Sequence, residues 1–283
     1  MTKHAHMHTH PDWADLAPEL EAEGEVLLPY ATQALDAIGE LVPAPGTVLD
    51  VGAGPGVVTA ALAARFPSAR VVAVDGDDTL LDRARRRGAA AGHPIEVLRT
   101  DLPEGFARLP AADLIWTAQT MHHLGDQRAA VAALAARLAP GGVLAVAEGG
   151  LPLRFLPRDI GLGRPGLAER LDALQATGFG EMRAALDGTV DVPEDWPALL
   201  RSAGLRDVRA RTFLVDRPAP LDDRTRTAVA RMLGRYLRMA DRLDPDDAEV
   251  LRRLTDPADP HNVRRRPDVF VLTARTVYVG TAP

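Results

Sequence analysis

The fold of this chain is decided by one short stretch, Val48-Leu49-Asp50-Val51-Gly52-Ala53-Gly54-Pro55-Gly56. Its first residues are apolar apart from Asp50, and they predict a buried strand over 47–51. Glycine at 52 and 54 lets the backbone turn sharply and approach another group without a Cβ in the way. Pro55 suits the first turn of a helix, where its missing N–H costs nothing. The stretch therefore predicts a strand, a tight turn and a helix over 57–66, the opening unit of an α/β fold.

The same alternation continues along the chain. Further strands are predicted over 70–75, 95–100, 113–117 and 142–148, with helices over 79–91 and 128–138. Most of these strands are almost wholly apolar, as strands covered by helices on both faces are. Helices between successive strands imply right-handed crossovers and a parallel sheet. The fold class is therefore α/β, a doubly wound Rossmann-like sheet.

The remaining chain is expected to surround this core. We predict a flexible His-rich tail over 1–12, a helical cap over 13–45 made of two helices, and a core over 46–150. A helical insertion over 151–190 then acts as a lid, followed by a core helix and strand over 191–217. A second helical insertion covers 218–266, including a long helix over 224–243, and a final core strand lies within 267–283. Insertions at the carboxyl edge of a sheet commonly cover the ligand crevice.

Composition excludes several classes of function. The chain has no cysteine, which rules out disulfides, thiolate zinc sites and cysteine-bound iron–sulfur clusters. The net charge is −6, and arginines are interspersed with acids, so no nucleic-acid partner is expected. No apolar run is long enough for a membrane span and no signal core is evident, so we expect a cytoplasmic protein without a membrane partner. No metal site is predicted, and a homodimer is left open.

Three acidic strand ends point to a nucleoside-containing ligand. The glycine pattern is Gly-x-Gly-x-Gly, with Val57 where a dinucleotide fingerprint would place its third glycine. Asp50 suits a cationic amino group better than a pyrophosphate. Asp75 ends the second strand about 20 residues later, where a carboxylate can bind both hydroxyls of a ribose. Asp101 and Leu102, after the third strand, fit an adenine amine and a ring face.

These residues resemble the class I S-adenosylmethionine-dependent methyltransferase family, in its small-molecule branch. The matching region is roughly 47–148 and includes Met121-His122-His123-Leu124 and the segment Leu138–Leu144. The resemblance implies a seven-stranded sheet whose last strand is antiparallel, with S-adenosylmethionine as the cofactor. It implies that Thr117 lies beside the sulfonium. The expected cofactor-binding residues are Asp50, Gly52, Ala53, Gly54, Asp75, Gly76, Asp77, Asp101, Leu102 and Thr117.

Candidates for catalysis follow the fourth and fifth strands. His122 and His123 lie where the methyl group should be, and histidine titrates near neutral pH. We prefer His123 slightly as the base or substrate anchor, against the alternative that both histidines only pack the site. Glu148 is a third candidate, against a structural capping role. Arg264, Arg265 and Tyr236 are candidates for binding the substrate, although a charged run before a strand is commonly surface.

The predicted function is transfer of a methyl group from S-adenosylmethionine to an O, N or C atom of a small organic molecule, with a secondary metabolite as the favoured acceptor. One alternative is an enzyme of the same fold with non-methylating chemistry such as cyclisation, because fold does not fix function. Another is an NAD(P)-dependent oxidoreductase, disfavoured by Val57. The identity of the acceptor depends on the two insertions, whose residues do not indicate a particular substrate.

Overall fold

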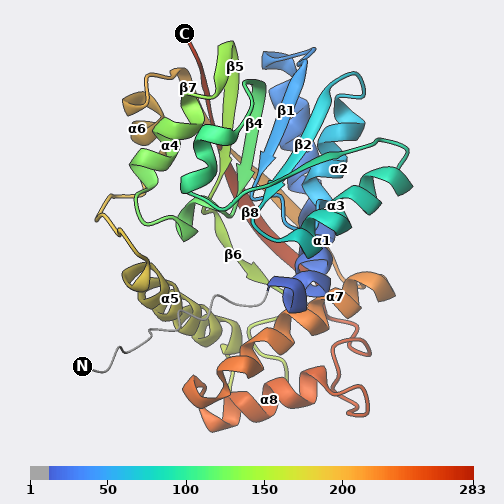
Figure 1. The fold of residues 1–283 in the computed structure, drawn as a ribbon. Helices are drawn as coiled ribbons and strands as arrows, with labels where there is room; N and C mark the ends of the chain where they lie inside the picture. Colours follow the sequence, from blue (N-terminus) through green and yellow to red (C-terminus); the bar gives the residue numbers. More distant parts are fainter. Residues whose placement is uncertain (1–12) are drawn as a thin grey trace, which may run out of the picture.

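A single eight-stranded sheet runs through the centre of the molecule (Figure 1). The computed structural model describes residues 13–283, so the predicted His-rich tail lies outside the described residues. The strand order is β3-β2-β1-β4-β5-β8, with β6 and β7 both pairing with β8. The strands β1 to β5 are parallel to one another, and β8 runs antiparallel to β5, β6 and β7. The strands are β1 (Thr47–Val51), β2 (Arg70–Asp75), β3 (Glu96–Arg99), β4 (Ala112–Ala118), β5 (Leu138–Ala147), β6 (Leu151–Arg154), β7 (Arg206–Arg217) and β8 (Val271–Thr281).

The doubly wound sheet with an antiparallel last strand confirms the predicted fold class, with one difference. Residues 151–154 were expected to belong to a helical insertion but form β6, which pairs with the first half of β8. The reason is a break in the preceding strand. Gly149 and Gly150 both have positive φ, +69° and +117°, so the chain leaves β5 and then resumes pairing against the same neighbour.

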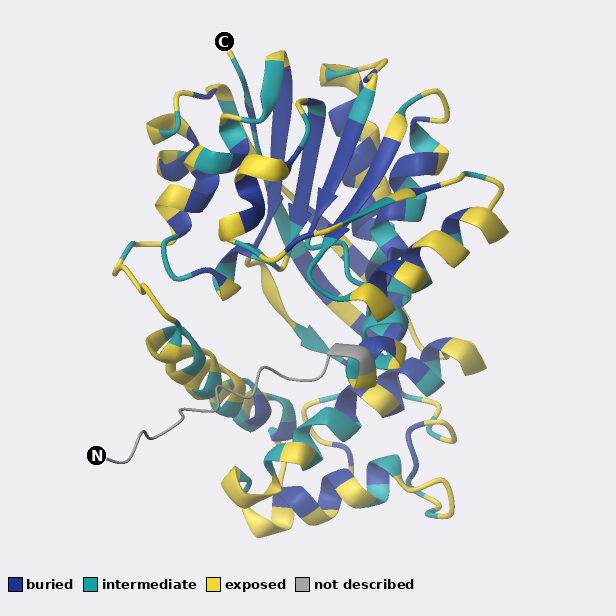
Figure 2. Cartoon of the chain, in the orientation of Figure 1, coloured by how far each residue is buried: buried dark blue, intermediate teal, exposed yellow. Residues whose placement is uncertain are grey.

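Helices cover both faces of the sheet, and its central strands are buried (Figure 2). On one face Val48, Trp116 and Val143 belong to the cluster that includes residues of α1, α2 and α3. On the other face Leu49, Val51 and Leu144 pack with residues of α4 and α6. The bounds of these helices are α1 (Trp13–Leu41), α2 (Val57–Arg65), α3 (Asp78–Ala90), α4 (Gln127–Ala135) and α6 (Trp196–Ser202).

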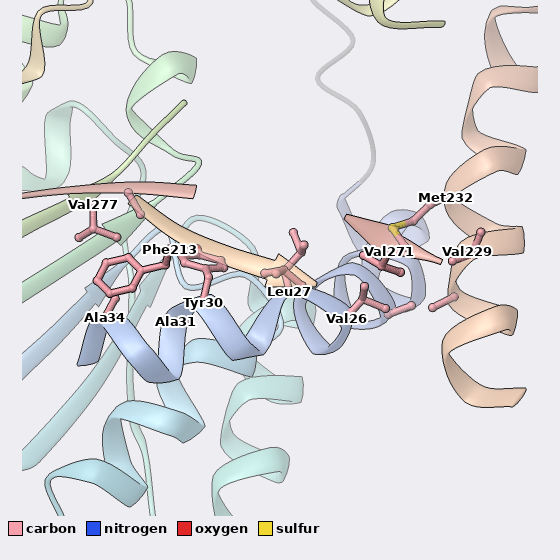
Figure 3. Close-up of a cluster of buried hydrophobic side chains, with 14 of the residues drawn as sticks. Val26, Leu27, Tyr30, Ala31, Ala34, Phe213, Val229, Met232, Val271 and Val277 are labelled. Atoms are coloured by element: carbon pink, nitrogen blue, oxygen red, sulfur yellow. The ribbon is translucent and has the colours of Figure 1, made fainter. Parts of the chain in front are cut away.

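The helix α1 is continuous, where the sequence indicated two helices. It bridges two parts of the core (Figure 3). Tyr30 and Ala34 lie beside Phe213 and Val277 of the sheet, whereas Val26 lies toward Val229 and Met232 of α7 (Asp223–Gly234). Apolar residues along most of its length are buried in this way, and that packing holds both halves in one helix.

Three helices lie beyond the carboxyl ends of the parallel strands (Figure 1). We call α5 (Leu167–Ala185), α7 (Asp223–Gly234) and α8 (Pro245–Thr255) the outer helices. The long helix expected over 224–243 ends as α7 at Gly234 and continues as a 3₁₀ segment, η3 (Arg235–Arg242), whose Met239 is non-helical. Within the described residues, no helix combines the length and apolarity that a membrane span requires.

Candidate active site

The glycine turn joins β1 to α2 and is fixed against β2. The amides of Gly52 and Ala53 both donate to the carbonyl of Val74, at 2.9 and 3.0 Å. The amide of Gly54 donates to Asp75 Oδ2 at 2.8 Å. Gly54 has φ +53°, and a Cβ placed on it would meet no atom within 4 Å. Gly52 has φ +75°, and a Cβ there would collide with the side chain of Thr120. The turn is therefore closed toward Thr120 and open beside Gly54, where a ligand could approach the backbone.

Asp50 is a buried carboxylate on β1. Its side chain accepts a hydrogen bond from the hydroxyl of Thr59, on the first turns of α2, at 2.6 Å. The residue is only 3% exposed. Burial raises the pKa of Asp50 to about 7, the Thr59 hydrogen bond opposes the rise, and the nearby Asp75 carboxylate adds to it. A buried carboxylate with a single such partner is costly, and a cationic ligand group beside it would relieve that cost.

Asp75 lies at the carboxyl end of β2. Its two oxygens accept from the amides of Gly54 and Asp77, at 2.8 and 3.1 Å. Burial raises the pKa of Asp75, and hydrogen bonds from the amides of Gly54, Asp77 and Gly76 oppose this rise. The amide contacts hold the carboxylate in a fixed orientation at the sheet edge. Asp77 is the N-cap of α3, since its Oδ1 accepts from the amide of Leu80 at 2.9 Å.

The ends of β3 and β4 complete this edge. Asp101 is exposed and pairs with Arg99 at 2.9 Å, while Leu102 is half-buried. A Cβ on Gly76 would lie 2.9 Å from Asp101 Oδ1, so the ends of β2 and β3 are close together. Thr117 is fully buried on β4 opposite Val51, and its hydroxyl has no hydrogen-bond partner among the described residues. The structure thus brings the predicted cofactor-binding residues together along one edge of the sheet.

A second cluster follows β4 and β5. Glu148 Oε1 accepts from the amides of Thr120 and Met121, at 3.0 and 2.8 Å. Its Oε2 lies 2.9 Å from His122 Nδ1. Glu148 is 4% exposed, so it is a buried anchor for the short 3₁₀ turn η2 (Met121–His123). His122, not the slightly preferred His123, is the histidine that Glu148 orients; His123 is exposed, with its ring 4.2 Å from that of His122.

The three expected substrate-binding residues have partners in other parts of the structure. The backbone carbonyl of Arg264 accepts from Arg226, and its side chain is exposed. The guanidinium of Arg265 donates to the carbonyls of Ala258 and Asp259, within the loop that follows α8. The hydroxyl of Tyr236 donates to Gln175 Oε1 on α5 at 3.1 Å. The structure does not bring Arg264 or Arg265 into contact with His122 or Glu148.

Sequence reasoning missed Thr59, Thr120 and Arg183. Thr59 could have been noticed, because it is the one polar residue in the otherwise apolar first two turns of α2. Thr120 and Arg183 have no comparable signal. Their contacts join segments far apart in the chain, such as Arg183 with the carbonyl of His122 at 2.9 Å.

The chain is similar in sequence to known methyltransferases. The family described as "Methyltransferase domain" matches residues 48–142. A trans-aconitate 2-methyltransferase of Methylobacterium radiotolerans is 31% identical over 234 residues, which cover 76% of this chain and 85% of the relative. The chain belongs to the S-adenosylmethionine-dependent methyltransferase family. A trans-aconitate 2-methyltransferase of Variovorax paradoxus is 37% identical over 105 residues, but the match spans only 39% of that relative.

A solved structure supports the fold. The structure of a candidate methyltransferase from Bacillus halodurans C-125 superposes on this chain with a TM-score of 0.50 and 17% sequence identity. The superposed region covers 89% of this chain and 98% of the Bacillus halodurans chain. At that identity the likeness concerns the architecture alone. Among the described residues, no group of three or more His, Asp or Glu side chains is arranged to hold a metal ion.

The residues of the sheet edge fit S-adenosylmethionine, the cofactor of this family. The open space beside Gly54 admits a ligand against the backbone. The carboxylate of Asp50 suits the amino group of the methionine moiety, and that of Asp75 suits the ribose hydroxyls. Thr117 offers a buried hydroxyl that has no hydrogen-bond partner within residues 13–283. When bound, the cofactor supplies a methyl group carried on a positively charged sulfur.

Proposed function

We propose that this methyltransferase acts on a carboxylate of a small organic acid and forms its methyl ester. The observation that carries the proposal is the relative from Methylobacterium radiotolerans, a trans-aconitate 2-methyltransferase aligned over 76% of this chain. Trans-aconitate offers carboxylates as its nucleophilic oxygens. In the proposed reaction a carboxylate oxygen bonds to the methyl carbon, the bond from that carbon to sulfur breaks, and sulfur keeps the electron pair.

The site chemistry supports an acceptor that is already ionised. Glu148 accepts from two backbone amides and faces His122, so both of its oxygens are engaged within the protein. It is therefore poorly placed to remove a proton from a substrate. A carboxylate needs no such base, because it is deprotonated at neutral pH. What the protein must supply is alignment of the acceptor oxygen and exclusion of water.

We assign His122 the role of orienting the acceptor. Its Nδ1 faces Glu148 at 2.9 Å, which leaves Nε2 available to an acceptor group. An imidazolium can donate from both nitrogens, to Glu148 and to a carboxylate oxygen. The His122–Glu148 pair also favours a second class of acceptor, a hydroxyl group. A neutral imidazole that is oriented by a carboxylate can accept a hydroxyl proton.

The product of the reaction separates the two acceptors, because methylation of a carboxylate gives an ester and methylation of a hydroxyl gives an ether. We would incubate the protein with S-adenosylmethionine carrying a labelled methyl group and either trans-aconitate and related di- and tricarboxylic acids, or matched hydroxy compounds. Labelled methyl ester identifies the first class, and labelled ether overturns the proposal.

The proposed setting is the cytoplasm, with the cofactor and one small acceptor as the binding partners. The net charge of −6 and the pairing of many arginines with acidic side chains support the proposal that no nucleic acid is bound. A homodimer stays a prediction, which sedimentation of the purified protein tests directly.

A further inference from the structure

The turn that carries His122 is held from two sides. On one side Glu148 accepts from the amides of Thr120 and Met121. On the other side Arg183, near the end of α5, donates to three backbone carbonyls. Its Nη1 lies 2.9 Å from the carbonyl of His122 and 2.6 Å from that of Leu124, and its Nη2 lies 3.4 Å from that of Gly125. Carbonyls at the end of a helical turn carry partial negative charge, so a cation there stabilises the turn.

The positive charge of Arg183 therefore interacts with the backbone carbonyls of the turn. No carboxylate lies within ion-pair distance of Arg183 in the described part of the chain, whereas its neighbour along the helix, Glu181, pairs with Arg242 at 2.8 Å. The turn is only three residues long and has few hydrogen bonds of its own, including His123 amide to Thr120 carbonyl at 3.0 Å. Short 3₁₀ turns have poor internal geometry, so outside contacts determine where such a turn lies.

Two further contacts join α5 and the segment after it to the same turn. The ring of Phe179, one helical turn before Arg183, lies 5.5 Å from the ring of His122. After the helix, the amide of Val190 donates to the carbonyl of Gly125 at 3.2 Å. A Cβ on Gly125 would collide with the backbone of Asp187 and Gly188. Side-chain, ring and backbone contacts therefore all link this outer helix to the turn that carries His122.

We propose that Arg183 is a positioning residue, which holds His122 in place against the acceptor and makes that placement depend on the docking of α5. The proposal rests on the proposed function, because it concerns the histidine that orients the acceptor. Arg183 acts through His122 and is not expected to touch the cofactor, whose residues lie along β1, β2 and β4. Its loss should lower kcat for methyl transfer and leave the binding of S-adenosylhomocysteine unchanged.

The test compares R183M with R183K and with R242M. Methionine keeps the length of the side chain but removes all donors, and lysine keeps a cation that can reach one or two carbonyls. R242M removes another arginine that binds α5, without touching the turn. We expect R183M to lower kcat at least tenfold with S-adenosylhomocysteine affinity within twofold of the parent protein. R183K should recover part of the loss, and R242M should behave like the parent.

One further variant and one spectroscopic measurement extend this test, and the spectroscopic measurement does not depend on activity. G125A should reproduce the R183M effect from the other side of the contact, because its Cβ displaces the segment after α5. The imidazole signal of His122 in a proton NMR spectrum, identified by its loss in H122N, should shift in R183M and not in R242M. This readout stands even if no carboxylic acid is methylated, so failure of the proposed function remains distinguishable. An unshifted His122 signal, an unchanged kcat, or equal losses of kcat and S-adenosylhomocysteine affinity in R183M would overturn the proposal.

Discussion

The buried carboxylate of Asp50, beneath the glycine turn, is expected to lower the stability of the ligand-free protein and to strengthen cofactor binding. Replacing Asp50 by asparagine tests both effects. The substitution keeps the size of the side chain and an oxygen that can accept from the Thr59 hydroxyl. It removes only the charge. Burial raises the pKa of Asp50 from its ordinary 3.8 to about 7, so in the absence of ligand the ionised form destabilises the folded state. We therefore expect D50N to be more stable than the parent protein at high pH and to bind the cofactor less tightly.

The expected magnitude follows from the pKa difference. The folded protein holds the Asp50 proton up to a higher pH than the unfolded chain, so stability falls as pH rises from about 4 to about 7. At roughly 1.4 kcal/mol for each pH unit, the cost of the ionised carboxylate grows by about 3 kcal/mol between pH 5 and pH 8. The free energy of unfolding of D50N relative to the parent protein should therefore increase by about 3 kcal/mol between these pH values.

Urea unfolding of both proteins without ligand, at pH 5 and pH 8, measures this difference. D82N is the matched control, because the Asp82 side chain is 57% exposed and pairs with Arg85 on the same helix. S-adenosylhomocysteine affinity at pH 8 should fall by about 10–100-fold in D50N, the loss of one charged hydrogen bond. If the stability difference between D50N and the parent is the same at both pH values, the burial of a charged Asp50 has been misjudged and the reasoning fails.

Three other substitutions test separate parts of the site. G54V should abolish S-adenosylhomocysteine binding, because the valine side chain fills the open space beside the turn. The positive φ at this position adds a stability cost of about 1–3 kcal/mol. Binding within threefold of the parent protein would contradict this prediction. T59V removes the hydrogen bond that lowers the pKa of Asp50, so cofactor affinity should drop at pH 7 and recover toward pH 9; a pH-independent loss would exclude that cause. E148Q should lower kcat at least tenfold with unchanged cofactor affinity, since it disturbs the orientation of His122; equal kcat would remove Glu148 from the account.

Much of the sheet was predictable because its strands are apolar and its turns contain glycine. The strand over 47–51 and the helix that follows agree with the structure almost to the residue, because a buried apolar run and the glycines of the turn leave few alternatives. β6 was not predictable in this way. Its pairing depends on the first half of β8, which lies more than 100 residues later in the chain, and two glycines before it suggested a loop.

The site likewise contains residues that short-range spacing predicts and residues that only long-range contacts define. Asp50 and Asp75 could be predicted as cofactor-binding residues because each stands at a fixed distance from the glycine turn, and short-range spacing is visible in a sequence. The choice between His122 and His123 was not visible, because it depends on Glu148 reaching across from β5. Arg183 was invisible for the same reason, since its partners lie about 60 residues earlier in the chain.

We propose that S-adenosylmethionine binds at the carboxyl edge of β1, β2 and β4, with Asp75 on the ribose. Calorimetric titration of the parent protein and D75A with S-adenosylhomocysteine and with NAD tests it most directly, and D78A serves as an exposed control at the start of α3. We expect tight binding of S-adenosylhomocysteine by the parent protein and D78A, binding at least tenfold weaker by D75A, and no binding of NAD. Equal affinity of D75A and the parent, or binding of NAD instead, would contradict it.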